Sequence, residues 1–420
     1  MEKLVIEGGH PLKGEVRVSG AKNSALPIMA ATLLTDEPCT IHNVPRLRDT
    51  QTMIKLLKSL GKSVVQTQDR LVITSQGTPQ HVADYDLVST MRGSFCVLGP
   101  LLAKLKRAKV SLPGGCVIGI RPVDLHLKGL KSLGAVIKIE NGYVDASAKQ
   151  LKGSHLYLGG VFGSSVLATA NVMMAATLAR GETVIESAAC EPEIEDLASM
   201  LELMGARIQG KGSPRLSITG VSKLRGAAYK IIPDRIEAGT FIVMAAATHG
   251  SITLKNVNIA HLMALTDKLQ EAGVKVYSEN GDVKVKCSRS YKPVSVTTHP
   301  YPGFPTDLQA QFLALMTMVQ GVCVLNDKVY PDRFMHIAEL NRMGANVRRE
   351  GGSAIVQGVK TLFGAPVMAS DLRASAALVI AGLAARGKTE VHRIYHLDRG
   401  YERLDEKLAA LGAKVQRVKE

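Results

Sequence analysis

The segment "LLKSLGKSV" (Leu56–Val64) has the pattern of a helix end, a glycine turn and the start of a strand. Five further copies read "GLKSLGAVI", "LELMGARI", "KLQEAGVKV", "LNRMGANV" and "LAALGAKV". The spacings between their glycines are 73, 71, 68, 71 and 68 residues. Glycine suits this position because helices commonly end at a residue in the left-handed conformation. The six glycines are Gly61, Gly134, Gly205, Gly273, Gly344 and Gly412.

A second pattern, an apolar helix of small residues that runs into a strand, repeats in step with the first. Four clear copies begin at Ser24, Leu167, Gly239 and Ala374, and two more divergent copies begin at Ser94 and Gln309. These helices are apolar on all sides, so we expect them to be buried. The helices of the first pattern carry charges on one face and are expected to lie outside them.

The two patterns together define six repeat units of about 70 residues, longer than the common solenoid repeats. A chain of 420 residues is also too long for one ordinary core. The simplest arrangement is two domains of three units each. The sequence therefore predicts an α/β fold with inner helices packed inside an outer layer of sheets.

The composition indicates what kind of molecule the protein binds and which cellular compartment it occupies. A net charge of +15 predicts an anionic partner. The basic residues are scattered, tryptophan is absent and aromatics make up 4%, which favours small phosphorylated molecules over nucleic acid. The N-terminus resembles neither a signal nor a transit peptide, and the longest apolar run, Ala374–Ala385, is too short to span a bilayer. We expect a cytoplasmic protein without membrane insertion.

One of the six cysteines stands apart from the others. The cysteines show neither a CxxC pair nor the spacing of a metal site, which suits a reducing compartment and predicts no bound metal. Cys116 follows Pro113-Gly114-Gly115, and Arg121 comes soon after it. A thiol in a flexible loop near a cation is partly ionised and reactive. The other five cysteines are expected to be structural.

Polar residues precede each inner helix and keep the register of the repeat. Capping of the helix start accounts for Ser164, Ser165 and Asp234 taken alone. It does not account for lysine and arginine, because a cation is disfavoured beside the positive end of the helix dipole. Such cations indicate an anion shared between side chain and helix end, as in a cleft built for phosphates and carboxylates. They are Lys22, Arg92, Arg235 and Arg373.

Several segments resemble the UDP-N-acetylglucosamine 1-carboxyvinyltransferases, a family of enolpyruvyl transferases, and the resemblance covers essentially the whole chain. It implies two inside-out α/β barrel domains of three units, residues 20–230 and residues 1–19 plus 231–420, with the active site in the cleft between them. It implies no cofactor. The segments are "SGAKNSALP", "LPGGCVIGIRPVDLH", "EPEIEDL", "FPTDLQAQF", "RFMHIAELNRMGA", "DLRASAALVIAGL" and "RIYHLDRGYERL".

The resemblance also implies a reaction. Phosphoenolpyruvate donates its enolpyruvyl group to the 3-hydroxyl of UDP-N-acetylglucosamine, and phosphate leaves after addition and elimination through a tetrahedral ketal. This is the first committed step of peptidoglycan synthesis, and so of cell-wall biogenesis, cell shape and cell division. The implied partners are these two small molecules and the antibiotic fosfomycin, which alkylates Cys116.

The resemblance assigns the chemistry to a few residues. Cys116 lies on a loop that acts as a lid, and it is expected to serve as a proton donor and as a thiol that adds to phosphoenolpyruvate. Asp307 is expected to accept the proton of the attacking hydroxyl. Lys22, Arg121 and Arg399 are expected to hold the phosphate and carboxylate, with Lys22 also acting in proton transfer.

The remaining implied residues bind the substrates. Asn23 is expected to contact the sugar and the intermediate, and Asp371 and Arg373 the intermediate or its neighbours. In the uridine-binding segment, Asp124 reads the uracil edge, while Arg92 helps to hold the nucleotide. The other expected contacts are Pro122, Val123, Leu125, Ser164, Ser165 and the backbone of Val329.

One segment departs from the family pattern. Some members carry a lysine that contacts the diphosphate in the segment equivalent to "LGGVFGSSV" (Leu158–Val166), where this chain has none. Its amides and hydroxyls at a helix start are still able to bind phosphate.

Two other functions compete with this interpretation. The enolpyruvyl transferase that acts on shikimate 3-phosphate shares the six-unit architecture, but it needs neither a lid cysteine nor a uridine segment. A non-catalytic, basic repeat protein would bind nucleic acid in a salt-sensitive way and would not respond to small phosphorylated ligands.

Overall fold

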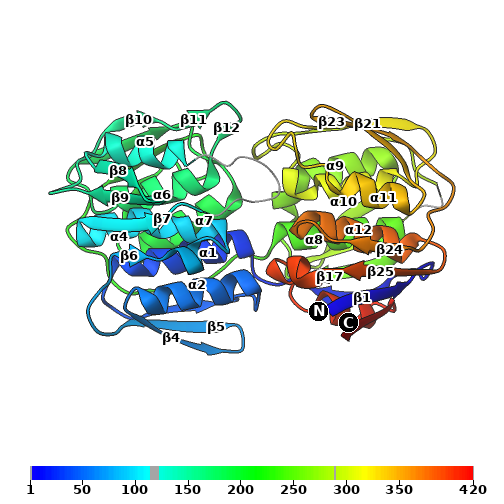
Figure 1. Ribbon diagram of the computed structural model, residues 1–420, viewed down its shortest axis with the longest axis horizontal. Helices are drawn as coiled ribbons and strands as arrows, with labels where there is room; N and C mark the ends of the chain where they lie inside the picture. The colour runs from blue at the N-terminus through cyan, green and yellow to red at the C-terminus, as the bar shows by residue number, and fades with distance from the viewer. Residues whose placement is uncertain (1, 114–122, 288–289, 420) are drawn as a thin grey trace. The chain divides into compact units, whose positions relative to one another are not determined.

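The computed structural model describes residues 2–113, 123–287 and 290–419. The chain forms two compact units (Figure 1). The first unit begins at Gly20 and ends at Ile232, and the second unit consists of the residues up to Ser19 and those from Pro233 onward. Each unit has a hydrophobic core of its own. Among the described residues, no helix is both long enough and apolar enough to cross a membrane.

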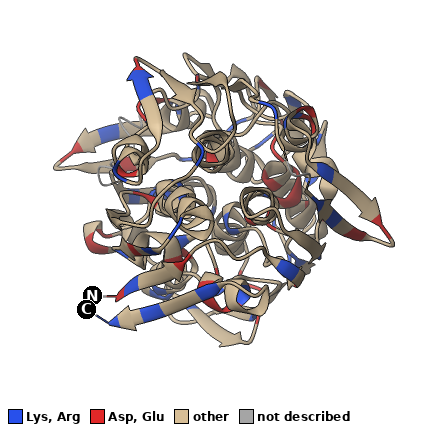
Figure 2. Cartoon of the chain, turned by 90° about the vertical axis from the view of Figure 1, so that its right-hand side faces the viewer, with Lys and Arg blue, Asp and Glu red and all other residues tan. Residues whose placement is uncertain are grey.

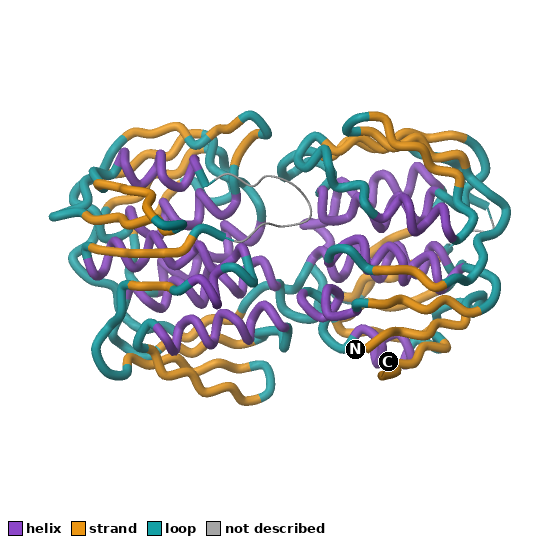
Figure 3. Tube along the Cα trace, viewed as in Figure 1, coloured by secondary structure: helices purple, strands orange, loops and turns teal. Residues whose placement is uncertain are grey.

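The predicted inner helices form in both units and are confirmed as buried. Every residue of the inner helix at 235–247 is buried, and Figure 3 shows the helices of each unit enclosed by strands. In the first unit the inner helices are α1 (Lys22–Ala31), α4 (Leu98–Leu105) and α6 (Val166–Ala176). In the second they are α8 (Arg235–Ala247), α10 (Gln309–Met316) and α12 (Leu372–Ala384).

The six repeated glycines are confirmed as helix-ending residues. Each has a φ between +87° and +104°, where a side chain would be strained. Each follows a second helix of its repeat and leads into a strand. The helices are α2 (Arg48–Ser59), α5 (Asp124–Ser132), α7 (Pro192–Leu203), α9 (Met263–Ala272), α11 (His336–Arg342) and α13 (Leu404–Ala410).

Each repeat contributes to one four-stranded sheet. The strand that follows the inner helix pairs in parallel with an edge strand and antiparallel with a strand on its other side. In the first unit the sheets are β16 (Ala228–Lys230), β3 (Cys39–His42), β5 (Arg70–Ser75), β4 (Lys62–Thr67); β6 (Val82–Ala83), β7 (Arg107–Ser111), β9 (Tyr143–Ser147), β8 (Val136–Glu140); and β10 (His155–Tyr157), β13 (Glu182–Glu186), β15 (Arg215–Thr219), β14 (Arg207–Gln209).

The N-terminal residues complete two sheets of the second unit. Strands β1 and β2 join strands that lie more than 200 residues later in the chain. Glu2 of β1 pairs with Lys419 of β26, so the two termini lie together (Figure 2). The sheets are β18 (Lys275–Glu279), β19 (Asp282–Lys286), β17 (Ser251–Lys255), β2 (Lys13–Arg17); β20 (Val296–Thr298), β21 (Val322–Asp327), β23 (Ser353–Gln357), β22 (Asn346–Glu350); and β24 (Pro366–Met368), β25 (Lys388–His392), β1 (Glu2–Glu7), β26 (Lys414–Lys419).

Short elements complete the fold. They include a two-stranded hairpin, a short α-helix and 3₁₀ helices of three to six residues. They are β11 (Gly159–Gly160), β12 (Gly163–Ser164), α3 (Tyr85–Val88), and the 3₁₀ helices η1 (Thr32–Leu34), η2 (Arg92–Val97), η3 (Ile259–Leu262), η4 (Thr306–Leu308) and η5 (Ile394–Arg399).

A buried carboxylate anchors the end of the first unit, where the chain passes into the second. Asp196 accepts hydrogen bonds from the hydroxyl of Tyr229 (2.5 Å), the amide of Ile232 (3.3 Å) and the hydroxyl of Ser24. Burial raises the pKa of Asp196. Since Ser24 directly follows Asn23, Asp196 also fixes the first turn of α1, where two predicted site residues stand.

Candidate active site

The first helix of the first unit positions Lys22 and Asn23. Both lie in the first turn of α1, whose preceding residue Ala21 offers no side-chain cap. The ammonium of Lys22 lies 3.3 Å from a carboxylate oxygen of Asp49, and the side chains are 12% and 5% exposed. This buried carboxylate compensates for the cation at the positive end of the helix dipole. An ammonium has three hydrogen-bond donors, and Asp49 accepts from one of them.

Asn171 of α6 connects three other elements of the first unit. Its Oδ1 accepts from the amide of Gly99 (2.8 Å), and its Nδ2 donates to the carbonyl of Phe95 (2.9 Å) and lies 2.8 Å from Nδ1 of His126. Because Gly99 fixes the orientation of the amide, Nδ2 donates to Nδ1 and the proton of His126 is on Nε2. This network ties η2, which begins at Arg92, to α5, which begins at Asp124.

His126 is neutral in the folded protein. Burial, together with the charge of Arg92, lowers the pKa of His126 to about 3. The ring also meets Phe95 edge-on at a centroid distance of 5.1 Å. His126 therefore has a structural role, and the hydrogen bonds of Asn171 hold η2 close to α5.

Acid is expected to destabilise the first unit through His126. In the unfolded chain the pKa of His126 is about 6.5, whereas in the folded protein it is about 3. Between these pH values the unfolded state therefore binds a proton that the folded state does not bind. The stabilisation is complete above pH 6.5 and falls with pH below it, by at most about 5 kcal/mol. Denaturant unfolding between pH 7 and 4 should show a shallower decline for His126→Gln than for wild type. An equally steep decline in His126→Gln would contradict the prediction.

The hairpin β11–β12 lies beside the start of α5. A Cβ on Gly160 would be 3.1 Å from Cδ1 of Leu125, so the hairpin backbone packs on this side chain. Ser164 lies in β12 and pairs with Gly159. Ser165 is the N-cap of α6, and its hydroxyl accepts from the amide of Ala168 (3.4 Å). Capping thus holds for Ser165, whereas Ser164 is a strand residue.

Three predicted residues lie outside the described part of the chain. They are Cys116, Arg121 and Pro122, and their positions are not described. Val123 immediately precedes α5, Asp124 is its first residue and Leu125 its second. The described part of the predicted uridine segment is therefore a helix start.

In the second unit, the carboxylate of Asp307 accepts hydrogen bonds from two arginines. Asp307 lies in η4, directly before α10. Its Oδ1 accepts from Nη1 of Arg333 (2.7 Å) and its Oδ2 from Nη2 of Arg373 (3.0 Å). The arginine side chains are only 5% and 3% exposed, whereas that of Asp307 is 26% exposed. The carboxylate is thus the accessible member of a buried ionic cluster.

The two arginines determine the charge state of Asp307. Burial by itself raises its pKa, but the charges and hydrogen bonds of Arg373 and Arg333 lower the pKa well below its ordinary value. Asp307 is therefore ionised over the whole physiological pH range. This keeps its oxygens available as proton acceptors, and it also makes the carboxylate a weak base.

The cap of α12 orients Arg373. The carboxylate of Asp371 accepts from the backbone amides of Arg373 (2.8 Å) and Ala374 (3.2 Å). Asp371 therefore acts as a helix cap, as does Asp234 at the start of α8. Arg399 is the last residue of η5. Of the predicted residues in this unit, Asp307 and Arg373 are in direct contact.

Asp327 links the loop that carries Val329 to the segment that carries Asp307. Its Oδ1 accepts from the backbone amides of Val329 (3.0 Å) and Tyr330 (2.7 Å). Its Oδ2 accepts from the hydroxyl of Thr306 (2.7 Å), the residue before Asp307. The amide of Val329 is thus engaged, so a backbone contact from Val329 to a ligand would come from its carbonyl.

Several buried polar atoms of the second unit, three of them on side chains that bond Asp307, have no hydrogen-bond partner among the described residues. Buried polar groups are normally paired, so a cluster of unpaired ones marks a place for a polar ligand or ordered water. They are Nε of Arg333, Nε of Arg373, Oε1 of Gln311, both side-chain polar atoms of Gln309, and Nε2 of His336.

The sequence analysis assigned no role to Arg333, Asp327 or Tyr401. Arg333 opens a segment that resembles the enolpyruvyl transferases, but it precedes the outer helix α11, and the search for polar residues covered the starts of inner helices. Asp327 ends β21 and Tyr401 follows η5. The links that matter for the site have no local signal, because Asp327 binds Thr306 from 21 residues away and Tyr401 binds Thr240 from 161 residues away.

The described cysteines are poor nucleophiles. Burial raises the pKa of each of the five, which are Cys39, Cys96, Cys190, Cys287 and Cys323. A thiol with a raised pKa carries little thiolate at neutral pH. Within the described residues there is also no group of histidine, cysteine, aspartate or glutamate side chains able to hold a metal ion.

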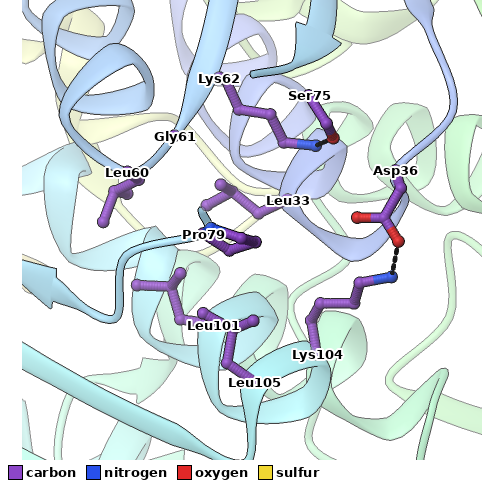
Figure 4. A pocket seen from close by; sticks show the side chains of 10 residues that line it. All are labelled: Leu33, Asp36, Leu60, Gly61, Lys62, Ser75, Pro79, Leu101, Lys104 and Leu105. Carbon is purple, nitrogen blue, oxygen red and sulfur yellow. Dashed lines mark hydrogen bonds and ion pairs between the residues drawn. The ribbon is translucent and has the colours of Figure 1, made fainter. Parts of the chain in front are cut away.

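Two small cavities are distinct from the predicted residues. One, of about 20 Å³, has room for about one water molecule. Figure 4 shows Lys62 beside it, donating to Ser75 (2.9 Å), and Asp36 paired with Lys104 (2.6 Å). The other, of about 230 Å³, lies at the C-terminal end of α8 and is lined by His249 and Tyr291. Neither is lined by a predicted site residue.

Comparison with known proteins gives a consistent result. A family model described as EPSP synthase (3-phosphoshikimate 1-carboxyvinyltransferase) matches residues 6–408. A protein of Trichlorobacter lovleyi named UDP-N-acetylglucosamine 1-carboxyvinyltransferase is 54% identical, with both chains covered completely. Proteins of the same name are 52% identical in Methylacidiphilum infernorum, covering 100% of this chain and 99% of the relative, and 53% identical in Geobacter metallireducens, covering 100% of both.

Solved structures support the fold. The enolpyruvyl transferase NikO from Streptomyces tendae superposes with a TM-score of 0.90 at 24% identity, covering 100% of this chain and 99% of that one. EPSP synthase from Acinetobacter baumannii superposes with a TM-score of 0.77 at 20% identity, with both chains fully covered. The predicted fold class is thereby confirmed.

Proposed function

Because this chain belongs to the family of EPSP synthase, we propose that it is an enolpyruvyl transferase that uses phosphoenolpyruvate as donor and the 3-hydroxyl of UDP-N-acetylglucosamine as acceptor. The observation that carries the proposal is an identity of 51–54% over the full chain with relatives that share one name. The reaction serves peptidoglycan synthesis. The likeness to EPSP synthase structures, at 20% identity, concerns the fold alone.

The proposed chemistry is an addition followed by an elimination. The oxygen of the 3-hydroxyl bonds to C2 of phosphoenolpyruvate while C3 gains a proton, which gives a tetrahedral ketal. Phosphate then leaves C2 and C3 loses a proton. Positive charge develops at C2 during both steps, and bound anions and carboxylates stabilise it.

Asp307 is the proposed acceptor of the hydroxyl proton. It is ionised and partly exposed, and three side chains that bond it, Arg333, Arg373 and Gln311, each have a buried polar atom without a partner among the described residues. Its two arginines reduce its basicity, so the proton transfers as the C–O bond forms rather than before it. Arg373 and Asp371 are proposed to lie next to the intermediate.

The cations of the first unit are proposed to bind the donor. Lys22, held by Asp49, and Arg121 would bind the phosphate and carboxylate of phosphoenolpyruvate together with Arg399 of the second unit. Cys116 is proposed to deliver a proton to C3 and to be the residue that fosfomycin alkylates. The raised pKa of every described thiol supports this assignment.

The nucleotide is proposed to lie at the starts of α5 and α6. The positive charge of Arg92 lowers the pKa of His126, which directly follows Asp124 and Leu125 in α5. The hairpin that carries Ser164 packs on Leu125. Clustering of these elements supports one binding region. The other proposed contacts are Asn23, Pro122, Val123, Ser165 and Val329.

Phosphate release tests the proposed function. The purified protein is mixed with phosphoenolpyruvate alone, with UDP-N-acetylglucosamine, or with shikimate 3-phosphate. We expect phosphate to be released with UDP-N-acetylglucosamine and not with the other two mixtures. Release with shikimate 3-phosphate instead would assign the chain to the other acceptor, and no release in any mixture would contradict the proposal.

A further inference from the structure

The hydroxyl of Tyr401 contacts one residue from each of the three inner helices of the second unit. Tyr401 is 2% exposed. Its oxygen lies 2.9 Å from Oγ1 of Thr240 in α8, 3.2 Å from Nε2 of Gln311 in α10 and 3.2 Å from Nη1 of Arg373 in α12. A single buried oxygen thus contacts the three helices that form the core of this unit.

The directions of these hydrogen bonds follow from the chemistry of the partners. The hydroxyl of Thr240 donates to the carbonyl of Ile236 (2.7 Å), so its oxygen accepts the proton of Tyr401. Arginine and the side-chain amide nitrogen of glutamine are donors, so Tyr401 accepts from Arg373 and Gln311. The phenol hydroxyl therefore makes three hydrogen bonds, of which it donates one and accepts two.

This arrangement fixes the rotation of the Arg373 guanidinium. Its Nη1 is held by Tyr401 and its Nη2 donates to Oδ2 of Asp307 (3.0 Å). Gln311 adds a second link, because its Nε2 also donates to the backbone carbonyl of Asp307 (2.8 Å). Tyr401 therefore reaches Asp307 by two routes, one through the side chain and one through the backbone.

We propose that Tyr401 is a positioning residue for the proton-accepting carboxylate, acting through Arg373 and Gln311 without touching substrate. The inference rests on the proposed function. Without the hydroxyl, the guanidinium is free to rotate and its two terminal nitrogens compete for Asp307. The carboxylate then departs from the geometry needed for proton transfer, where a small displacement has a large effect on rate.

The test is Tyr401→Phe, which removes one oxygen and keeps the ring. We expect kcat for phosphate release to fall about 10- to 100-fold, the range for losing a hydrogen bond to a charged group. The KM for each substrate should change less than threefold, since no substrate contact is lost. A lower melting temperature with unchanged kcat would overturn the proposal, because that is what a purely structural hydroxyl would give.

Two further variants make the test specific. Tyr291 donates its hydroxyl to the carbonyl of Ala246 (2.9 Å) near the other end of α8, so Tyr291→Phe controls for losing a tyrosine hydrogen bond to this helix and should keep kcat. Thr240→Val removes the acceptor of Tyr401 and an acceptor of Gln311 (3.2 Å). It leaves the bonds from Arg373 and Gln311 to Tyr401, so its kcat should lie between those of wild type and Tyr401→Phe. Equal effects of Tyr291→Phe and Tyr401→Phe would also overturn the proposal.

Failure of this inference is distinguishable from failure of the proposed function. If wild type releases phosphate with UDP-N-acetylglucosamine while Tyr401→Phe matches it, the function stands and the positioning role falls. If wild type releases none, the function falls, and the positioning role falls with it because no proton transfer remains for Tyr401 to assist.

Discussion

Asp307→Asn is expected to lower kcat by about 10²- to 10⁴-fold, the usual contribution of a positioned acid or base. The amide keeps the shape of the carboxylate but accepts no proton under these conditions. Since the amide side chain would still fill the space between Arg333 and Arg373, substrate binding should suffer less than turnover. Steady-state rates of phosphate release, with both substrates varied, measure the two effects separately.

The same substitution is expected to lower the stability of the second unit. It removes the negative charge between two buried guanidiniums, and breaking a buried ion pair in this way is costly. We expect a loss of about 3 kcal/mol, at the low end of the range for such pairs, because the side chain of Asp307 is 26% exposed. Denaturant unfolding measures this loss, and rates should be compared well below the melting temperature.

A carboxylate of the same unit provides the control. Asp405 accepts from Arg417 through both oxygens and is 18% exposed, and it has no place in the proposed chemistry. Asp405→Asn should retain the kcat of wild type. If Asp307→Asn also retained it, Asp307 would not be the proton acceptor.

Cys116→Ser is expected to slow alkylation by fosfomycin on the order of 10²-fold or more, and to slow or abolish turnover. A thiolate opens the epoxide by forming an S–C bond while the C–O bond breaks and the alkoxide takes a proton. The serine hydroxyl is a much weaker nucleophile without an adjacent base. The measurement is the rate at which fosfomycin increases the mass of the intact protein, which does not depend on the activity of the variant.

Cys190 gives a matched control for this experiment. It is the half-buried cysteine at the turn before α7, and burial raises its pKa. Cys190→Ser should be inactivated by fosfomycin as fast as wild type. Undiminished alkylation of Cys116→Ser, or protection in Cys190→Ser, would remove Cys116 from the proposal.

The surroundings of Lys22 show what a local rule leaves out. A lysine at a helix start predicted a bound anion shared between its side chain and the helix end. The structure adds a carboxylate of the protein itself, because the ammonium of Lys22 lies beside Asp49 in the next helix of the same unit. Sequence reasoning recognised the unusual cation, but the identity of its partner depends on how α1 packs on α2.

The sequence by itself determined the repeat, the glycine ends of six helices and the burial of six others. These features depend on neighbours within a few residues: a left-handed φ needs glycine, and a helix that is apolar on all sides must avoid water. The tertiary structure alone decided that Arg333, 26 residues along, and Arg373, 66 residues along, meet on Asp307, and that Tyr401 holds Arg373. Two of these contacts join residues of the same repeat and one joins neighbouring repeats, and the periodicity of the sequence does not specify which of these distant side chains meet.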